Sequence, residues 1–349
     1  HLIDENDEMI RNLRNAAMYR MIFDWLVGLN LTRAATVKGG RTIKVGRVMT
    51  PTLAIVVKRE LEIRHFVPTP YFQLELNLGH FKALWFDPVA KTNKIESLEA
   101  AQSIHAKLTP TAHVNQIETE RKTIYAPSLH SLLELQKEAN KFYGFTSAET
   151  LKIAQSLYEK KLITYPRTES KHLPTAFATT IASNIQAAAT LPQFEQIANH
   201  ILNNGTHIQK IAHSKRYVDD KKLTDHHAIT ITDVPIGRKS LTPGEAKIYD
   251  LIVKRLLAIF LPPYVLDKTN VIVMCGGEHF KASGNIVIDK GYTILYESQK
   301  RKEEQPLPPL QEGQQLTVYH NQILSKMTEP PARYTDSTLL DAMFHAGRF

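Results

Sequence analysis

Two stretches of alternating apolar and polar residues, separated by a long helical segment, set the strongest limit on how this chain folds. Such alternation is typical of half-buried β-strands. It occurs in residues 71–78, 81–86, 112–124, 265–274, 279–288 and 315–320. Because residues 128–248 show helical periodicity instead, the pattern predicts one β domain interrupted by an inserted helical domain.

The N-terminal part of the chain is predicted to be helical. Apolar residues recur at helical spacing over residues 7–31, where Arg20 and Asp24 lie four positions apart. A surface pair of that order contributes only about 0.3 kcal/mol, so a structural pair and a ligand-facing role both stay open. Thr50 and Pro51 are predicted to cap the next helix, whose N-terminus beside Arg47 is suited to a phosphate. A plain capped helix is the alternative.

The stretch from Leu162 to Ser170 is the strongest candidate for chemistry. A residue before proline is pushed toward extended geometry, so Tyr165 cannot simply continue the preceding helix. Side chains alternate in an extended segment, which puts Tyr165 and Arg167 on the same side. A tyrosine nucleophile beside an arginine suits attack on a phosphodiester. The alternative is a Tyr-Pro turn with a surface arginine.

Composition limits the class of protein. The chain has 349 residues, too many for one simple core, and a net charge of +8, which favours a polyanionic partner. Its single cysteine, Cys275, excludes an internal disulfide and a cysteine zinc site, and fits a reducing cytosol. No apolar run reaches membrane-spanning length, so we expect no membrane partner.

The adjacent histidines His226 and His227 are a second candidate for chemistry. Adjacent side chains point in different directions, and no nearby cysteine or third histidine completes a zinc set. A histidine that handles a phosphate or a proton is therefore favoured over a zinc ligand. A buried or merely exposed pair is the remaining alternative.

In their order along the chain, several segments together resemble the type IA DNA topoisomerases, and within them the topoisomerase III group. The matching segments are residues 24–33, 46–53, 135–140, 154–159, 163–170, 225–229 and 330–337. Met49 and Asp336 depart from the family, which usually has glutamine and glutamate there.

The resemblance assigns roles to the candidate residues. It implies that Tyr165 becomes joined to the 5′ phosphate of a single DNA strand, that Arg167 positions this phosphate and that His226 helps to organise the attack. The residues expected to bind DNA are Arg20, Asp24, Arg47, Thr50, Glu169, Ser170, His227 and Arg333. A phosphotyrosine bond conserves the phosphodiester, so resealing needs no ATP.

The resemblance also implies the fold class, a multidomain α+β toroid with an all-α groove domain, a split β arch domain and an inserted helical domain that carries Tyr165. The expected ranges are 1–66 and 327–349 for the groove domain, 67–127 and 251–326 for the arch, and 128–250 for the insert. Swinging the helical domain away is expected to open a gate for a second strand.

The chain begins at His1 without a methionine, and we expect a fragment of a longer enzyme. The family holds magnesium with acidic residues of an N-terminal Toprim domain, so this fragment is expected to bind no metal itself. The expected enzyme is a monomeric, cytoplasmic DNA topoisomerase that relaxes negative supercoils or decatenates DNA. The fragment alone is expected to bind single-stranded DNA without complete strand passage.

Two other functions are open. A tyrosine relaxase or strand transferase also uses tyrosine on a single strand, but its usual histidine-apolar-histidine triplet is not reproduced by His226 and His227. The other is a non-catalytic single-stranded-DNA-binding protein in which Tyr165 stacks on a base.

Overall fold

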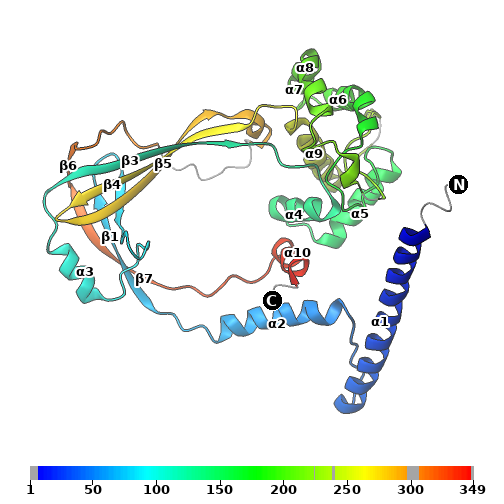
Figure 1. Cartoon of the computed structure of the whole chain (residues 1–349), viewed down its shortest axis with the longest axis horizontal. Coiled ribbons are helices and arrows are strands. Elements are labelled where there is room, and N and C mark those ends of the chain that lie inside the picture. The colour runs from blue at the N-terminus through cyan, green and yellow to red at the C-terminus, as the bar shows by residue number, and fades with distance from the viewer. Residues whose placement is uncertain (1–6, 224, 238–239, 297–305, 347–349) are drawn as a thin grey trace. The chain divides into compact units, whose positions relative to one another are not determined.

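The computed structural model describes residues 7–223, 225–237, 240–296 and 306–346. The chain forms two compact units (Figure 1). One contains the residues up to Val67 together with those from Pro330 onward, and the other contains Pro68–Glu329. No helix among the described residues is long and apolar enough to cross a membrane.

The first unit is helical. It contains α1 (Asp7–Gly39), α2 (Met49–Arg64) and α10 (Asp336–Phe344). The basic loop after α1 folds back on the helix because Thr32 accepts a hydrogen bond from the Val45 amide at 2.9 Å and donates one to the Val45 carbonyl. The helix α1 ends at Gly39, about two turns beyond residue 31, where its apolar pattern ends.

The predicted capping of α2 by Thr50 is wrong. The helix begins at Met49 and its N-cap, Val48, makes no side-chain capping bond. Thr50 lies inside the first turn, where its hydroxyl accepts a hydrogen bond from the Gly46 amide at 3.0 Å. The threonine therefore holds the loop before the helix and does not cap its first turn.

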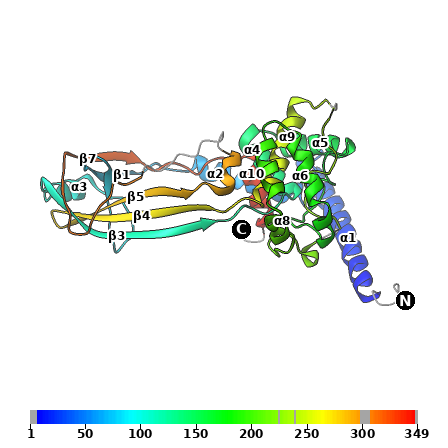
Figure 2. The ribbon, with the colours of Figure 1, turned by 90° about the horizontal axis from the view of Figure 1, so that it is seen from above.

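The described residues of the second unit form a seven-stranded sheet with the order β6-β3-β4-β5-β2-β1-β7. The strands are β1 (Pro70–Asn77), β2 (Lys82–Trp85), β3 (Thr111–Ile124), β4 (Tyr264–Cys275), β5 (Glu278–Asp289), β6 (Gln315–Thr317) and β7 (His320–Met327). Figure 2 shows β3, β4 and β5 side by side. Since β3 pairs antiparallel with β4, and β1 with β7, strands from both β stretches share one sheet.

The predicted single strand over residues 315–320 is two strands. The Val318 amide donates to the Pro110 carbonyl and the Tyr319 amide to the Asn77 carbonyl, which redirects the chain between β6 and β7. These two strands lie at opposite ends of the strand order although their ends are three residues apart, a reach of ~11 Å. The sheet therefore curls until its edges come close.

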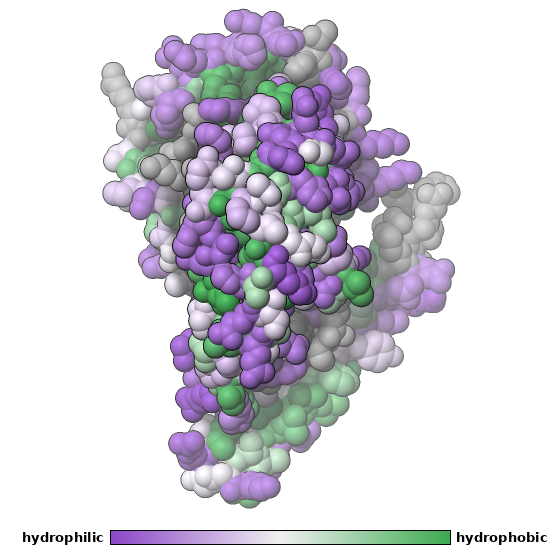
Figure 3. Space-filling model, turned by 90° about the vertical axis from the view of Figure 1, so that its left-hand side faces the viewer, coloured by the Kyte–Doolittle hydropathy of each residue, from purple (hydrophilic) through white to green (hydrophobic). Residues whose placement is uncertain are grey.

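The inner face of the curled sheet is apolar. Leu74, Leu76, Val271, Val273 and Phe280 are completely buried there, and α3 (Leu98–His105), capped by Ser97, adds Ala101. On the side of the molecule shown in Figure 3, hydrophilic residues cover most of the surface. The alternation in the sequence thus separates a core face from a solvent face.

Besides the sheet and α3, the described residues of the second unit form further helices. They are α4 (Leu132–Tyr143), α5 (Ser147–Glu159), α6 (Ile181–Ala189), α7 (Glu195–Asn203), α8 (Gly205–Ala212) and α9 (Pro243–Ala258), with 3-10 turns η1 (Thr175–Thr179), η2 (Asp220–Lys222) and η3 (Gly291–Tyr296). Capping boxes start two of them, formed by Thr146 with Glu149 and by Thr242 with Glu245. The predicted helix over residues 176–189 is divided at Thr180, and α7 and α8 were not predicted.

The most buried helix is α9, whose Leu251, Ile252 and Leu256 lie in the core of the helical part. The expected boundary between residues 250 and 251 falls inside this helix. The apolar run that follows residue 250 therefore completes a helix of the inserted part before the chain enters β4. The position of this domain boundary follows from how α9 packs, because the sequence of an amphipathic helix does not mark where one domain ends and the next begins.

Candidate active site

Tyr165 lies in an extended segment that follows α5. Lys161, with a φ of 62°, turns the chain out of the helix, and Ile163 then forms a bridge with Ile231. The Thr164 amide donates to the Thr230 carbonyl at 2.9 Å, and the Thr164 hydroxyl accepts from the Thr230 amide at 3.0 Å. The segment is thus extended, as the residue before a proline requires.

Burial alternates along this segment. Pro166, Thr168 and Ser170 are buried, whereas Tyr165 is half-buried and Arg167 is exposed. Tyr165 and Arg167 consequently share the outer side of the segment, the arrangement that alternation predicts.

The Tyr165 ring contacts two aromatic side chains. The His226 ring centroid lies 4.4 Å from that of Tyr165 with an interplanar angle of 46°. Tyr158, at the end of α5, meets the ring edge-on, with centroids 5.4 Å apart and an angle of 77°. Such tilted and edge-on contacts restrict the ring and contribute ~1 kcal/mol each.

The backbone of the histidine segment is tied to the tyrosine segment. The Thr168 hydroxyl donates to the His226 carbonyl at 3.0 Å, and the Thr164 hydroxyl donates to the Ala228 carbonyl at 3.1 Å. The neighbouring His227 turns elsewhere, because its Nδ1 donates to the Ala228 carbonyl at 2.8 Å and its ring lies 6.0 Å from that of Phe177. Of the two histidines, His226 is the one placed against Tyr165.

Arg167 is oriented by α5. In the amide orientation that satisfies both side chains, the Gln155 oxygen accepts from Arg167 Nη2 at 2.9 Å and from Nε at 3.3 Å. Gln155 and Tyr158 are functional candidates that the residue-by-residue reasoning missed. Their signal was their place on the last turns of the helix that leads into Tyr165.

Ser170 does not lie where a DNA-binding residue is expected. It is 3% exposed. Its hydroxyl accepts from the His172 amide at 3.2 Å and lies 3.4 Å from the Lys222 carbonyl, to which it donates. These contacts give Ser170 a part in shaping the loop, and its DNA-binding role stays a prediction; Glu169 next to it is exposed.

In the helical unit, the main partner of Asp24 is Arg47 and not Arg20, whose pairing with Asp24 the sequence left open. The carboxylate of Asp24 binds Arg47 through two nitrogens, Nε and Nη2, the latter at 3.2 Å. This hydrogen bonding holds the pKa of Asp24 below its usual value, and Arg20 adds only a smaller electrostatic effect. Asp24 thus pairs with Arg47, which the loop brings close and which binds through two nitrogens, in preference to Arg20 one helical turn away.

Arg333 lies in a segment that α2 anchors. Arg59 donates to the Ala332 carbonyl at 2.7 Å and its guanidinium lies 4.3 Å from the centroid of the Tyr334 ring. Arg333 itself pairs with Glu60 at 3.1 Å and is exposed. The predicted DNA-binding side chain is therefore held by a carboxylate at the surface.

No group of three or more histidine, cysteine, aspartate or glutamate side chains among the described residues could hold a metal ion. The described residues do not fit the magnesium that the resemblance implies.

Comparison with known proteins gives consistent results. The family model described as DNA topoisomerase, Topoisom_bac, matches residues 8–347. DNA topoisomerase 3 of Bacillus subtilis is 37% identical over 97% of the chain and 47% of the relative, and that of Bacillus licheniformis is 36% identical over 99% and 48%. The chain spans about half the length of these curated relatives.

A solved structure agrees in fold. The full-length topoisomerase I of Thermotoga maritima superimposes with a TM-score of 0.72 at 26% identity, over 95% of this chain and 53% of that one.

Proposed function

Because this chain belongs to the type IA DNA topoisomerases, in their topoisomerase III group, we propose that Tyr165 cleaves one strand of single-stranded DNA and stays joined to its 5′ phosphate. The phenolic oxygen forms a bond to phosphorus and the phenol loses its proton. The bond from phosphorus to the 3′ oxygen of the preceding nucleotide breaks, and that oxygen takes up a proton. The reverse reaction reseals the strand without ATP.

The observation that carries this proposal is the packing of His226 against Tyr165. The two rings, whose centroids are 4.4 Å apart, come from segments far apart in the sequence that hydrogen bonds join. A nucleophile needs a fixed orientation toward phosphorus. When folding already fixes that orientation, the entropy cost of aligning the groups is not part of the activation barrier, which is then lower by several kcal/mol. We assign to His226 the part of holding and orienting the phenol.

Arg167 is proposed to bind the phosphate under attack. It lies on the same side of the segment as Tyr165, and Gln155 orients its guanidinium. A guanidinium forms two parallel bonds to phosphate oxygens and stabilises the charge that develops on them. By analogy with single donors that stabilise such charge in other enzymes, its removal is expected to slow cleavage ~100-fold or more.

The DNA path is proposed to include the Asp24–Arg47 pair, Arg20, Arg333 and Thr50, all in the helical unit. The proposed domain ranges are those expected from the sequence, except that the inserted helical domain extends to the end of α9. Strand passage, relaxation and decatenation are proposed for the whole protein, because this chain spans only about half the length of its relatives. The chain alone is proposed to bind single strands through its basic groups, with an affinity that falls as salt rises.

The test uses the longest natural polypeptide that contains this chain. It is mixed with a single-stranded oligonucleotide and magnesium, denatured and examined for a covalent adduct. We expect an adduct that Tyr165→Phe abolishes. An adduct of the same yield in the Tyr165→Phe variant would refute the assignment of the nucleophile.

A further inference from the structure

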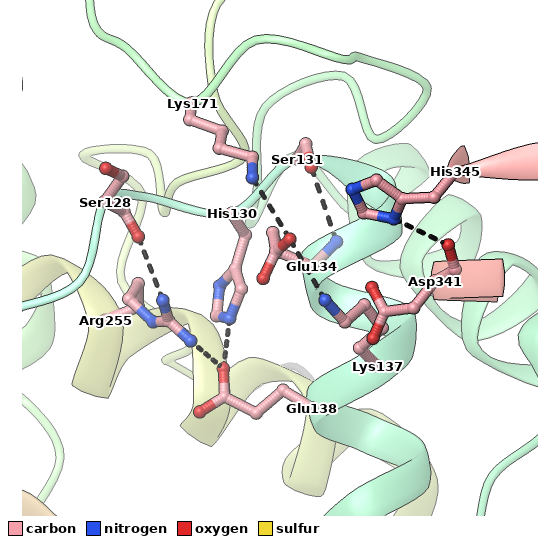
Figure 4. A network of polar contacts seen from close by, with 10 residues as sticks. All are labelled: Ser128, His130, Ser131, Glu134, Lys137, Glu138, Lys171, Arg255, Asp341 and His345. Atoms are coloured by element: carbon pink, nitrogen blue, oxygen red, sulfur yellow. Dashed lines mark hydrogen bonds and ion pairs between the residues drawn. The ribbon is translucent and has the colours of Figure 1, made fainter. Parts of the chain in front are cut away.

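A buried network of ionisable side chains joins α4, α9 and the segment that leads into α4 (Figure 4). Glu138 of α4 accepts from Arg255 Nη2 of α9 at 2.5 Å, and His130 Nε2 donates to the same oxygen. His130 is completely buried and Arg255 is 8% exposed. Charged groups are buried only when they are paired, so each member of this network depends on the others.

The network holds the short strap of residues 128–132 that leads into α4. Arg255 Nη1 donates to the Ser128 carbonyl at 2.9 Å. His130 is itself part of the strap and is fixed through its side chain, while the Ser131 hydroxyl accepts from the Glu134 amide at 3.3 Å. The strap is thus fixed on one side by α9 and on the other by α4.

The backbone of the same strap is hydrogen-bonded to both the Tyr165 segment and the His226 segment. The Leu132 amide donates to the Thr168 carbonyl at 2.9 Å, three residues after Tyr165. The Ile229 amide donates to the His130 carbonyl at 2.8 Å, three residues after His226. The segments that hold the two facing rings therefore rest on neighbouring residues of one strap.

The segment Leu135–Asn140, which the sequence analysis used only for resemblance, gains a structural meaning here. Leu135 and Ala139 enter the core, and Gln136 and Asn140 donate to backbone carbonyls around the turn between α4 and α5. Glu138 reaches the strap through its side chain, which accepts from His130. A buried ion pair is often no more stabilising than apolar residues, so fixing one geometry is the stronger reason for its presence.

We propose that Glu138 and Arg255 are positioning residues for cleavage: with His130 they fix the strap that sets the distance between the Tyr165 and His226 segments. This inference rests on the proposed function. Neither residue touches the reacting atoms. Their effect reaches the site through two backbone hydrogen bonds, where a displacement of about 1 Å changes the rate up to 100-fold.

The experiment compares Glu138→Gln and Arg255→Lys in the longest natural polypeptide that contains this chain. Single-turnover adduct formation at saturating oligonucleotide gives the rate constant, and its dependence on oligonucleotide concentration gives the affinity. We expect Glu138→Gln to lower the rate constant at least about tenfold with less than a twofold change in affinity. Arg255→Lys, which keeps the charge but loses the two-pronged contact, is expected to fall between this variant and the wild type.

A second measurement follows the strap directly. In Glu138→Gln, hydrogen exchange at the Leu132 and Ile229 amides is expected to speed up at least about tenfold, because each of these hydrogen bonds has one partner in the strap, which is no longer fixed. The control is Ile201→Ala in α7, a buried apolar side chain of the same core that lies outside the strap and its polar network. It is expected to destabilise the core yet keep the cleavage rate of the folded protein and the exchange at both amides.

The outcomes separate the two proposals. If the wild type forms the Tyr165 adduct and Glu138→Gln cleaves as fast as the wild type, or loses no more rate than Ile201→Ala, the positioning role is wrong and the proposed function stands. If the wild type forms no adduct at Tyr165, the proposed function is wrong, and with it any role in cleavage. Unchanged exchange at the Leu132 and Ile229 amides would also overturn the role of the network.

Discussion

Acid should weaken the network around Glu138, and the pKa of Glu138 in the folded protein sets how much stability is lost. Burial alone would raise the pKa of Glu138, but His130 and Arg255 outweigh burial and lower it from 4.5 to about 2. A folded-state pKa below the unfolded value means that the ionised carboxylate stabilises the fold above pH 4.5. That stability is lost as the pH falls from 4.5 toward 2.

The magnitude is ~3 kcal/mol at pH 7, from a difference of about 2.5 pKa units at about 1.4 kcal/mol per unit. At pH 3 about one unit of that difference remains effective, or ~1 kcal/mol. His130 acts in the same direction, because burial and Arg255 lower its pKa below 6.5. Its part of the stability is complete above pH 6.5 and decreases as the pH falls below that value.

The assay is hydrogen exchange at the backbone amides of α4 and α9, whose rates give the local free energy of opening. Glu138→Gln is expected to lower that free energy by ~3 kcal/mol at pH 7 and by less than half as much at pH 3. Ile201→Ala serves as the control, since a cavity in the core carries no charge and its cost is independent of pH. A gap between wild type and Glu138→Gln that stays constant from pH 7 to pH 3 would refute this reasoning.

Three further results are expected. Tyr158→Ala should slow adduct formation about two- to tenfold by removing the edge-on ring contact, and a single-turnover rate equal to wild type would contradict that role. Asp24→Asn should release Arg47 for phosphate; fluorescence anisotropy should then show tighter single-strand binding at low salt and a salt slope steeper by about one ion, whereas weaker binding would count against it. Gly291→Ala should lower the melting temperature strongly, since its φ is +47° and a Cβ there would lie 2.3 Å from carbonyl oxygens. Gly277→Ala, with positive φ but open space, should cost only ~1 kcal/mol, so equal losses would contradict the steric argument.

Local patterns predicted most of the strands. Alternation is a property of neighbouring residues, so the strands of both β stretches could be placed within a few residues. The division between β6 and β7 could not, because the amides of Val318 and Tyr319 bond to carbonyls of Pro110 and Asn77, far away in the sequence. Helix ends were less predictable for a similar reason, as the long α1 and the division at Thr180 show.

The same distinction applies to the site. The outward positions of Tyr165 and Arg167 follow from alternation next to a proline, and the structure agrees. The approach of His226 to Tyr165 came only from the resemblance, since the two residues are far apart in the sequence. The pairing of Asp24 with Arg47 and the burial of Ser170 were not predicted, because the partners are an arginine across a loop and the backbone of another loop, both distant in the sequence.

The most direct test of the account is to map the bond between protein and DNA. The longest natural polypeptide containing this chain is given a single-stranded oligonucleotide labelled at either end, and the adduct is digested with trypsin. The account predicts that the fragment with the 3′ label stays attached, through its 5′ phosphate, to Tyr165 in the peptide of residues 162–167. Attachment at another residue, or retention of the fragment with the 5′ label, would contradict it.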